Sequence, residues 1–578
     1  MTLSKSVSKN ATSLYVTKSM RVNGVTTSKV IEKLGTVAEL EKKLNGRDPI
    51  EWAEEYVKEL TLKDQEGRRE VIVKYSPAEI IEKDKQRLYS GGYLFLQRIY
   101  YELGIDKICK KLTEKRRFDF DIDSILSRLI YGRIIFPSSK LATYELSKKF
   151  FEQPNFDIQH IYRALEVIGE DMDFIQAELY KNSTKVIERA AGVLYYDCTN
   201  YFFEIEQSDG LKQYGYSKEH RPNPIVQMGL FMDGNGLPLA FSINEGNTNE
   251  QITLKPLEKK ILSDFELSRF VVCTDAGLSS AANRRFNDVS GRAFITTQSV
   301  KNLKGFLKKW ALDNNGWHLS DESAEKNMLY DISKIDESEH KESTFYKEQW
   351  INEDKLEQRL IVTYSVKYKN YQRKIRDGQI VRAEKLLKTN PSKFTKAKQN
   401  DYKRFVSKLS VTDEGEVAEN DFYCINTQLI ADEEVYDGFY AVCTNLEDDV
   451  ASIVKINHRR WEIEECFRIM KHEFKARPVY LIRDERIKAH FMTCFISLLI
   501  YRILEKKLDE KFTCSQIINE LRDMNYLEVL GEGYIPAYTR TDFTDALHDA
   551  YGFRTDYQIL TQSHMKNIFK LSKKAKTL

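Results

Sequence analysis

The chain has 578 residues with a formal net charge of only +2, and 42% of its residues are hydrophobic. This length predicts roughly three to five domains with real cores, and the near-neutral charge excludes nucleic-acid binding through a global positive field, so that local basic patches are needed. The eight cysteines form no CxxC pair and no Cys/His cluster of zinc spacing, which excludes a structural zinc and indicates a reducing compartment.

The first residues, MTLSKSVSKN, lack the apolar stretch of a signal peptide. The most apolar segment, Phe491–Tyr501, is too short to span a bilayer and is typical of a buried helix. We therefore expect a soluble, cytoplasmic protein with no membrane partner.

Residues 1–75 are predicted to form a basic hairpin and a DNA-contacting arm. Six Lys/Arg and one acid lie in residues 1–35, and two strand-like runs flank Asn23-Gly24, the strongest short-range hairpin signal. A basic β-ribbon can lie against DNA, although a solvated edge hairpin explains the same pattern. A helix is predicted over Thr36–Leu60 and a short strand over Glu70–Tyr75.

Residues 76–189 are predicted to form a helical domain. Pro137 ends one helix, and Ser138-Ser139 cap the next one. Plain packing explains this domain without any DNA contact. The helical segments with the clearest bounds are Leu94–Leu112, Ile122–Phe136, Phe156–Ile168 and Phe174–Ala190.

Residues 190–299 alternate between apolar runs and helical patterns. Two buried strands, Gly192–Asp197 and Phe270–Asp275, each end in an aspartate. The other predicted elements are a hairpin (Ile225–Met232 and Leu237–Ile243), helices at about Asn249–Leu262 and Leu278–Asn287, and a strand at Arg292–Gln298. This order matches a ribonuclease H-like α/β fold, a mixed five-stranded sheet with flanking helices.

Residues 300–435 are predicted to be a charged insertion domain. Lys367–Arg404 carries 13 Lys/Arg against three acids, a net of +10 (13 − 3), with aromatic residues interleaved. Such a run suits phosphate neutralisation and base stacking, whereas a solvated pair of charged helices is the alternative. The DNA contacts predicted here are Lys393, Lys396, Lys398, Lys403 and Arg404.

The core resumes over residues 436–500, with a strand at Tyr436–Thr444 and a long helix that begins at Asp448. On the period of an α-helix, Arg460, Glu464 and Lys471 fall within roughly 40° of one another. An ordinary ion pair beside a buried face gives the same pattern. Residues 501–578 are predicted to be a helical region with a basic tail, Met565–Leu578, that is disordered or contacts phosphate. Two helices are predicted after Phe474, over Ile487–Lys507 and Ser515–Asn525.

Two strand-end aspartates, Asp197 and Asp275, together with Glu464 would form an oxygen-only site at one sheet edge. Hard oxygen ligands suit Mg²⁺ or Mn²⁺ rather than Zn²⁺. Two such ions can activate a nucleophile and stabilise the leaving oxygen in phosphoryl transfer. Arg460 and Lys471 can hold the neighbouring phosphates.

On these motifs the sequence resembles the DDE transposases of bacterial insertion sequences, in the insertion-sequence-4-like superfamily with a Tyr-Arg-Glu-Lys signature. The signature Tyr-x2-Arg-x3-Glu-x6-Lys aligns with Arg460, Glu464 and Lys471, and Asn457 stands at its Tyr position. The blocks that carry the rest of the resemblance are YYDCTNYFFE (Tyr195–Glu204), GYSKEHRPN (Gly215–Asn223), EGNTNE (Glu245–Glu250), CTDAGLSS (Cys273–Ser280), DGFYAVCTN (Asp437–Asn445) and RPVYLIRDERIKAH (Arg477–His490).

The resemblance implies a metal-dependent endonuclease and polynucleotidyl transferase in which Asp197, Asp275 and Glu464 bind two Mg²⁺, with Mn²⁺ as a substitute. It implies a homodimeric synaptic complex that binds the terminal inverted repeats of its own element, cleaves them and joins them to target DNA. Lys218, His220 and Arg221 are expected to contact DNA. The protein is expected in the bacterial cytoplasm, at the nucleoid.

Two other interpretations stay open. One is a catalytically inactive relative that still binds DNA ends, and the other is a ribonuclease H-fold nuclease that only hydrolyses. The choice of glutamate is also ambiguous because Glu462 and Glu465 flank Glu464, although the helical wheel favours Glu464.

Overall fold

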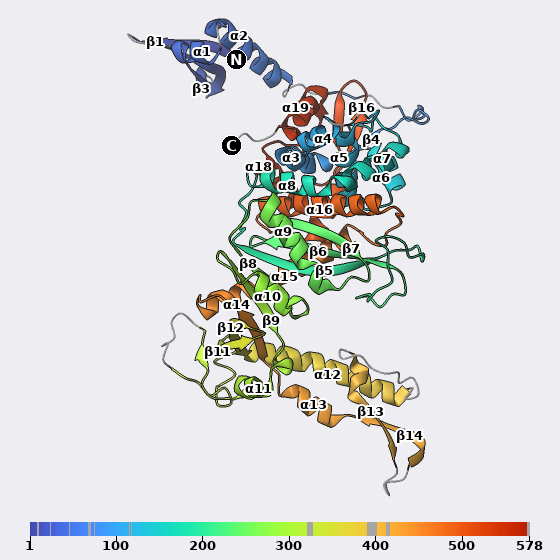
Figure 1. Cartoon of the computed structure of the whole chain (residues 1–578). Coiled ribbons are helices and arrows are strands. Elements are labelled where there is room, and N and C mark those ends of the chain that lie inside the picture. Colours follow the sequence, from blue (N-terminus) through green and yellow to red (C-terminus); the bar gives the residue numbers. More distant parts are fainter. Residues whose placement is uncertain are drawn as a thin grey trace. The chain divides into compact units, whose positions relative to one another are not determined.

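The structure is a computed structural model, and it describes residues 1–8, 11–22, 25–44, 47–66, 71–73, 76–114, 116, 118–320, 328–389, 401–411 and 417–574. The chain divides into two compact units (Figure 1). The first contains Met1–Lys85 and Val529–Glu532, and the second contains Gln86–Glu528 and Gly533–Leu578. The first unit thus extends beyond residue 75, where the sequence predicted its end.

The first unit is an antiparallel sheet with two helices. The predicted hairpin is confirmed, because Val22 pairs with Val25, while the turn residues Asn23-Gly24 lie outside the described residues. The predicted strand at Glu70–Tyr75 is wrong over residues 71–73, since no described strand pairs with them. The elements are β1 (Thr2–Val7), β2 (Thr12–Val22), β3 (Val25–Thr36), α1 (Val37–Lys43) and α2 (Pro49–Glu66).

The second unit begins with the predicted helical domain. Gly104, with a φ of 60°, splits the segment that was predicted as one helix. The predicted cap is confirmed, since the Ser139 hydroxyl accepts a hydrogen bond from the Ala142 N–H at 3.1 Å. The helices are α3 (Tyr93–Glu102), α4 (Ile105–Glu114), α5 (Ile122–Ile135), α6 (Lys140–Ser147), α7 (Ile158–Glu170) and α8 (Met172–Ser183).

Helix α16 (Asp484–Lys507) joins these helices to the sheet. It packs against α3, α5 and α7 on one side and against β7 on the other (Figure 1). Among the described residues it is the one helix long and apolar enough to cross a membrane, but 94% of its apolar window is buried inside the protein. Burial on all sides is typical of the central helix of a large core.

A mixed sheet forms the centre of the second unit. Among the described residues it has nine strands in the order β10-β11-β12-β15-β9-β8-β5-β6-β7. Strand β5 pairs in parallel with β8 and antiparallel with β6. The strands are β5 (Val193–Phe202), β6 (Ile225–Asp233), β7 (Pro238–Glu245), β8 (Phe270–Thr274), β9 (Arg292–Gln298), β10 (His318–Leu319), β11 (Thr344–Glu353), β12 (Leu356–Ser365) and β15 (Phe439–Thr444).

The predicted sheet of five strands therefore has too few strands. Strands β7, β6, β5, β8 and β9 are the five predicted from residues 190–299, but β15 pairs with the free edge of β9 and β12 pairs with β15. An uncovered strand edge leaves backbone N–H and C=O groups without partners, which favours this extension. Three strands within the first half of the predicted insertion domain, the last ending at Ser365, thus belong to the sheet. Helices α9 (Leu254–Asp264), α10 (Ala281–Phe286) and α11 (Gly305–Leu312) lie between these strands in the chain.

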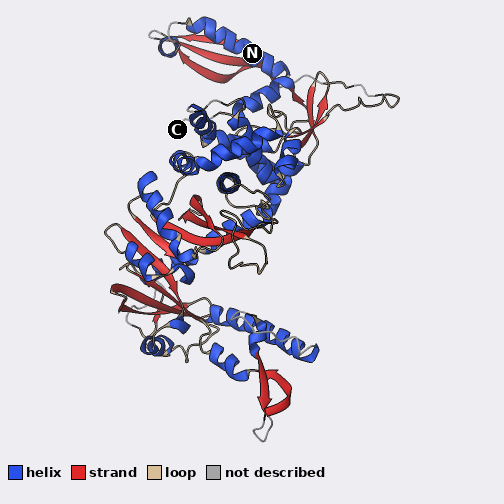
Figure 2. Ribbon diagram, turned by 45° about the vertical axis from the view of Figure 1, so that its right-hand side comes forward, coloured by secondary structure: helices blue, strands red, loops and turns tan. Residues whose placement is uncertain are grey.

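The part of the insertion that leaves the sheet consists of helices α12 and α13 with a β-hairpin (Figure 2). The hairpin strand β14 packs against α12, and Phe405 and Ala383 are buried in a small core of their own. The bounds are α12 (Val366–Thr389), β13 (Val406–Val411), β14 (Val417–Ile425) and α13 (Thr427–Glu434).

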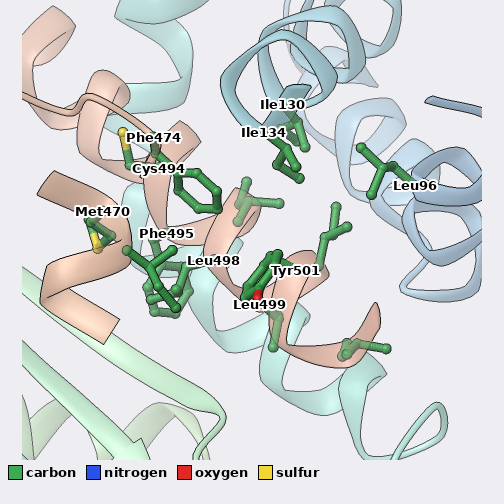
Figure 3. Packing of buried hydrophobic residues seen from close by; sticks show 14 of the residues in the cluster. Leu96, Ile130, Ile134, Met470, Phe474, Cys494, Phe495, Leu498, Leu499 and Tyr501 are labelled. Carbon is green, nitrogen blue, oxygen red and sulfur yellow. The ribbon is translucent and has the colours of Figure 1, made fainter. Parts of the chain in front are cut away.

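The predicted long helix from Asp448 is three pieces, α14 (Val450–His458), α15 (Trp461–Arg468) and a π-helix η6 (Ile469–Glu473). A π-helix inserts an extra residue into a helical turn and so rotates everything after it. Met470 within η6 and Phe474 directly after it lie in one hydrophobic cluster with Phe495, Leu498 and Tyr501 of α16 (Figure 3). The packing of these apolar side chains therefore decides where the residues of η6 point.

The C-terminal region adds a small four-stranded sheet, in the order β18-β17-β16-β4, and three helices. The prediction of a basic tail from Met565 is wrong up to Ser572, because this segment forms α19 with Met565 and Ile568 buried. The bounds are β4 (Leu88–Ser90), α17 (Cys514–Asp523), β16 (Asn525–Val529), β17 (Gly533–Pro536), α18 (Asp542–Tyr551), β18 (Leu560–Thr561) and α19 (Gln562–Ser572).

Candidate active site

Asp197 and Asp275 lie side by side on neighbouring parallel strands. Tyr195 of β5 pairs with Cys273 of β8, and each aspartate follows two residues later, Asp197 within β5 and Asp275 directly after β8 in a backbone that is still extended. Residues two apart point to the same face of a sheet. The two carboxylates are therefore at the same level on the same face.

Asp197 is not at the end of its strand as predicted, because β5 continues to Phe202. Pairing of β5 with β6 extends as far as Phe202 and Ile225, which keeps the strand going beyond the aspartate. Asp275 does follow the last residue of β8, and its Oδ1 accepts the Leu278 N–H at 3.1 Å, so that it caps a short 3-10 helix.

The surroundings of Asp197 disfavour its ionised form. Burial raises the pKa of its carboxyl to about 7, with Lys218 opposing this shift and the charge of Asp275 adding to it. Its Oδ1 also accepts the Cys198 N–H at 2.7 Å. Two interacting carboxylates that water only partly reaches form a site in which a cation is favoured.

Glu464 comes from α15, which packs against β5. Its Oε1 lies 3.4 Å from Arg460 Nη1, and its side chain is 59% exposed. It lines a cavity of about 580 Å³ together with Arg460, Asn457, His458 and Trp461. This exposure leaves the Glu464 carboxylate able to turn toward a ligand.

The two neighbouring glutamates have other partners. Glu462 is buried, with Oε1 2.9 Å from Arg459 Nε and Oε2 3.8 Å from Arg502 Nη2. Glu465 Oε2 accepts from Arg468 Nε at 2.9 Å. Of the three, only Glu464 lines the cavity, which agrees with its position on the helical wheel.

Arg460 interacts electrostatically with the two aspartates and with Glu464. Burial opposes its charge, but Tyr440, Glu464, Asp197 and Asp275 together raise the pKa of the guanidinium. Arg460 thus connects carboxylates from two sides of the site. The Arg460 side chain is only 21% exposed, so its pair with Glu464 is partly buried.

The residues fit a hard divalent cation by their chemistry, since all three donors are carboxylates. In the described part of the chain, the oxygens of Asp197, Asp275 and Glu464 do not all lie within 4.8 Å of one another. Glu464 would have to leave Arg460 to complete a shared site. The two aspartates therefore interact with each other, whereas Glu464 pairs with Arg460 on α15.

A second acidic group lies in the C-terminal region, and its side chains are closer to one another than those of Asp197, Asp275 and Glu464 are. Single ligand atoms of Asp545, His548 and Asp556 lie within 4.8 Å of one another. Arg554 Nη2 is 2.7 Å from both Asp545 Oδ1 and Asp556 Oδ2. Arginine already neutralises these carboxylates, so this group is a salt-bridge cluster.

Lys471 does not lie in one row with Arg460 and Glu464 as predicted, because η6 rotates it toward β5. Its Nζ donates to Thr199 Oγ1 at 2.6 Å, two residues after Asp197. Lys218, from the loop after β5, donates from its Nζ to the carbonyl of Cys198 on β5 at 2.6 Å. Burial and the charge of Lys218 lower the pKa of Lys471 to about 8, and Asp197 opposes this shift.

The loop that carries Lys218, His220 and Arg221 is fastened to β5. Asn200 Nδ2 donates to the Tyr216 carbonyl at 3.0 Å, and the Lys218 N–H donates to Asn200 Oδ1 at 3.3 Å. The Arg221 guanidinium lies 4.2 Å from the centre of the Phe202 ring. His220 has a left-handed backbone, with a φ of 57°. All three predicted DNA contacts thus lie on one loop beside Asp197.

The predicted DNA contacts of the insertion are supported less well. Arg404 stays a prediction, although its guanidinium donates to both carboxylate oxygens of Glu433 at 3.0 Å and its side chain is 15% exposed. Lys403 is partly exposed, and Lys393, Lys396 and Lys398 lie outside the described residues. Elsewhere in the run, Arg376 is paired with Asp437 at 2.6 Å and buried. Part of the net charge is thus used within the protein.

Asn457, at the signature's Tyr position, is buried. Its amide donates to the Tyr440 hydroxyl at 3.0 Å, and Tyr440 lines the same cavity as Arg460. Two further residues near the site, Glu219 and Arg477, were missed by the sequence analysis. Only their membership in the GYSKEHRPN and RPVYLIRDERIKAH blocks pointed to them.

A family model described as a transposase DDE domain matches residues 201–500, which is 300 of 578 residues (500 − 201 + 1). No curated protein matches the chain significantly. Among solved structures, the cryo-EM structure of a piggyBac transposase synaptic complex with hairpin DNA is similar at 8% identity and a TM-score of 0.35. The match covers 76% of this chain and 82% of that chain.

Proposed function

The chain belongs to the transposase DDE domain family, and we propose on this basis that it binds the terminal inverted repeats of its own mobile element, cleaves them and joins them to target DNA. The observation that carries the proposal is the placement of Asp197 and Asp275 at one level on adjacent parallel strands. We further propose that it belongs to the insertion-sequence-4-like branch and that strands β5–β9 form a ribonuclease H-like core. The strand order β9-β8-β5-β6-β7 supports this core.

Asp197 and Asp275 would hold divalent metal, Mg²⁺ by the hardness of their oxygens, with Glu464 as the third ligand. When bound, two such ions supply Lewis-acid activation of the attacking oxygen and stabilise the leaving oxygen. The chain's own contribution is positional. Arg460 can hold a phosphate on the Glu464 side of Asp197, while Lys218 and Lys471 provide positive charge along β5.

The supporting experiment uses purified protein, Mg²⁺ and the DNA that flanks its own gene. Cleavage at the element ends, followed by joining to a second duplex, is the expected result. Cleavage without joining would favour a hydrolytic nuclease, and specific binding without cleavage would favour an inactive relative. Absence of any DNA binding would overturn the proposal. A homodimer on paired ends, in the bacterial cytoplasm at the nucleoid, is part of the same proposal and rests on the family resemblance.

Glu464 can be separated from its neighbour by a matched pair of variants. Glu464→Gln is expected to lower the cleavage rate about a hundredfold or more, because it removes a proposed metal ligand. Glu465→Gln, which changes a carboxylate paired with Arg468 outside the cavity, is expected to cleave within about threefold of wild type. Single-turnover cleavage of end DNA measures both. Equal losses of cleavage rate in the two variants would mean that Glu464 is not a metal ligand.

A further inference from the structure

Glu219 sits between two cations that come from a distant part of the chain. Its Oε1 lies 3.7 Å from Lys471 Nζ, and the same oxygen contacts Arg477 Nη1. The side chains of Lys471 and Arg477 are only 12% and 14% exposed, and that of Glu219 is 25% exposed. One carboxylate oxygen thus contacts two largely buried cations, in a place where water screens their charges poorly.

The two cations are held by β5, the strand that carries Asp197. Lys471 donates to Thr199 on this strand. Arg477 is fixed by the residues after it, because the Val479 N–H donates to the Phe202 carbonyl at 3.0 Å and the Glu204 N–H donates to the Val479 carbonyl at 3.3 Å. The Lys471 side chain and the backbone two residues after Arg477 are thus both hydrogen-bonded to β5.

Glu219 comes from the loop between β5 and β6, whose backbone is held to β5 through Asn200. Its neighbours Lys218 and His220 are exposed. The Glu219 side chain is 25% exposed, against 12% for Lys471 and 14% for Arg477. Of the three side chains, Glu219 is therefore the one that a ligand arriving from solvent most readily displaces.

We propose that Lys471 and Arg477 form a phosphate seat beside Asp197, and that Glu219 occupies this seat until the DNA backbone displaces it. A phosphodiester shares one negative charge between two non-bridging oxygens, so that one oxygen can face the Lys471 ammonium and the other the Arg477 guanidinium, whereas Glu219 meets both cations with the single oxygen Oε1. The Thr199 hydroxyl, already within 2.6 Å of Lys471 Nζ, lies at the edge of the same seat. This inference rests on the proposed function and adds Arg477 and Glu219 to its DNA-binding residues.

The test measures binding of a fluorescein-labelled duplex, taken from the DNA that flanks the gene, across a series of salt concentrations. Glu219→Gln is expected to tighten binding about tenfold, the gain if Glu219 fills the seat in roughly nine molecules of ten. Arg477→Gln is expected to weaken binding and to reduce the log–log salt slope by about 0.9, one phosphate contact. The double variant Glu219→Gln/Arg477→Gln, whose charge is balanced, is expected to keep the reduced slope.

Glu166→Gln is the matched control. Its carboxylate also faces two arginines, Arg483 at 2.7 Å and Arg486 at 2.9 Å, with a similar exposure of 30%. It is expected to bind DNA as wild type does. If Glu219→Gln instead loses thermal stability without binding more tightly, or if the double variant keeps the wild-type slope, the three residues are only an ion-pair network. Wild-type protein that binds no duplex would overturn the proposed function itself, a result distinct from both.

Discussion

Replacing Asp197 or Asp275 by asparagine is expected to lower DNA cleavage about a thousandfold or more while leaving DNA binding nearly unchanged. Both carboxylates are proposed metal ligands, and several kcal/mol of transition-state stabilisation depend on the ions they hold. The fold should tolerate the changes. Asparagine caps a helix about as well as aspartate does, so the contact of Asp275 with the Leu278 N–H can be kept.

Single-turnover cleavage and equilibrium binding of the same end duplex measure this separation. Arg460→Gln serves as the contrast, since it changes a proposed phosphate contact and should weaken binding as well as cleavage. An aspartate variant that cleaves within tenfold of wild type does not belong to the metal site. A variant that loses binding and cleavage in parallel has a damaged fold.

Thermal melting gives a readout that does not depend on cleavage. Mg²⁺ should raise the melting temperature of the wild-type protein, because a ligand that binds only the folded state stabilises it, and this rise should disappear in Asp197→Asn. In a chelator, which removes Mg²⁺, Asp197→Asn is no longer expected to melt at a lower temperature than wild type. The pKa of Asp197 is raised to about 7 from 3.8, so its ionised form destabilises the fold progressively as pH rises through this window. Asp197→Asn in chelator should therefore be at least as stable as wild type at pH 8, and equal at pH 4.

Phe474→Ala is expected to reduce the free energy of unfolding by about 3–5 kcal/mol. Phe474 is fully buried directly after the π-helix, and its ring lies 6.1 Å from that of Tyr501 on α16 (Figure 3). Removing the ring leaves a cavity between η6 and α16. Because η6 directs Lys471 toward β5, the rate of cleavage should fall further than the amount of folded protein does.

Denaturant unfolding, with hydrogen exchange of residues 461–474, measures both effects. Phe306→Ala is the control, since Phe306 lies on α11 and is 70% exposed, and its loss should cost less than about 0.5 kcal/mol. A loss in Phe474→Ala no larger than that of the control would mean that the end of η6 is not anchored by this ring. Slower cleavage strictly in proportion to folded protein would mean that η6 does not direct Lys471.

Elements with local signals can be predicted from the amino-acid sequence alone. The hairpin around Asp233-Gly234-Asn235-Gly236 was predicted because turn residues separate two apolar runs, and β6 and β7 pair there as expected. The strand Arg292–Gln298 was predicted with the bounds that β9 has. Apolar runs followed by aspartate also identified β5 and β8, since buried strands need apolar side chains on both faces. These patterns act within a few residues and need no knowledge of the partner.

Only the tertiary structure decided where those elements meet. The register between Tyr195 and Cys273 brings Asp197 level with Asp275, and strand pairing across distant segments has no signal in either strand alone. Pairing of β12 with β15 moved part of the predicted insertion into the sheet, because the edge of β9 needed a partner. The π-helix is the clearest case. A regular 3.6-residue period placed Lys471 two turns after Glu464 on the same side of the helix, whereas packing of Met470 and Phe474 against α16 turns it toward Thr199 and the carboxylate of Glu219.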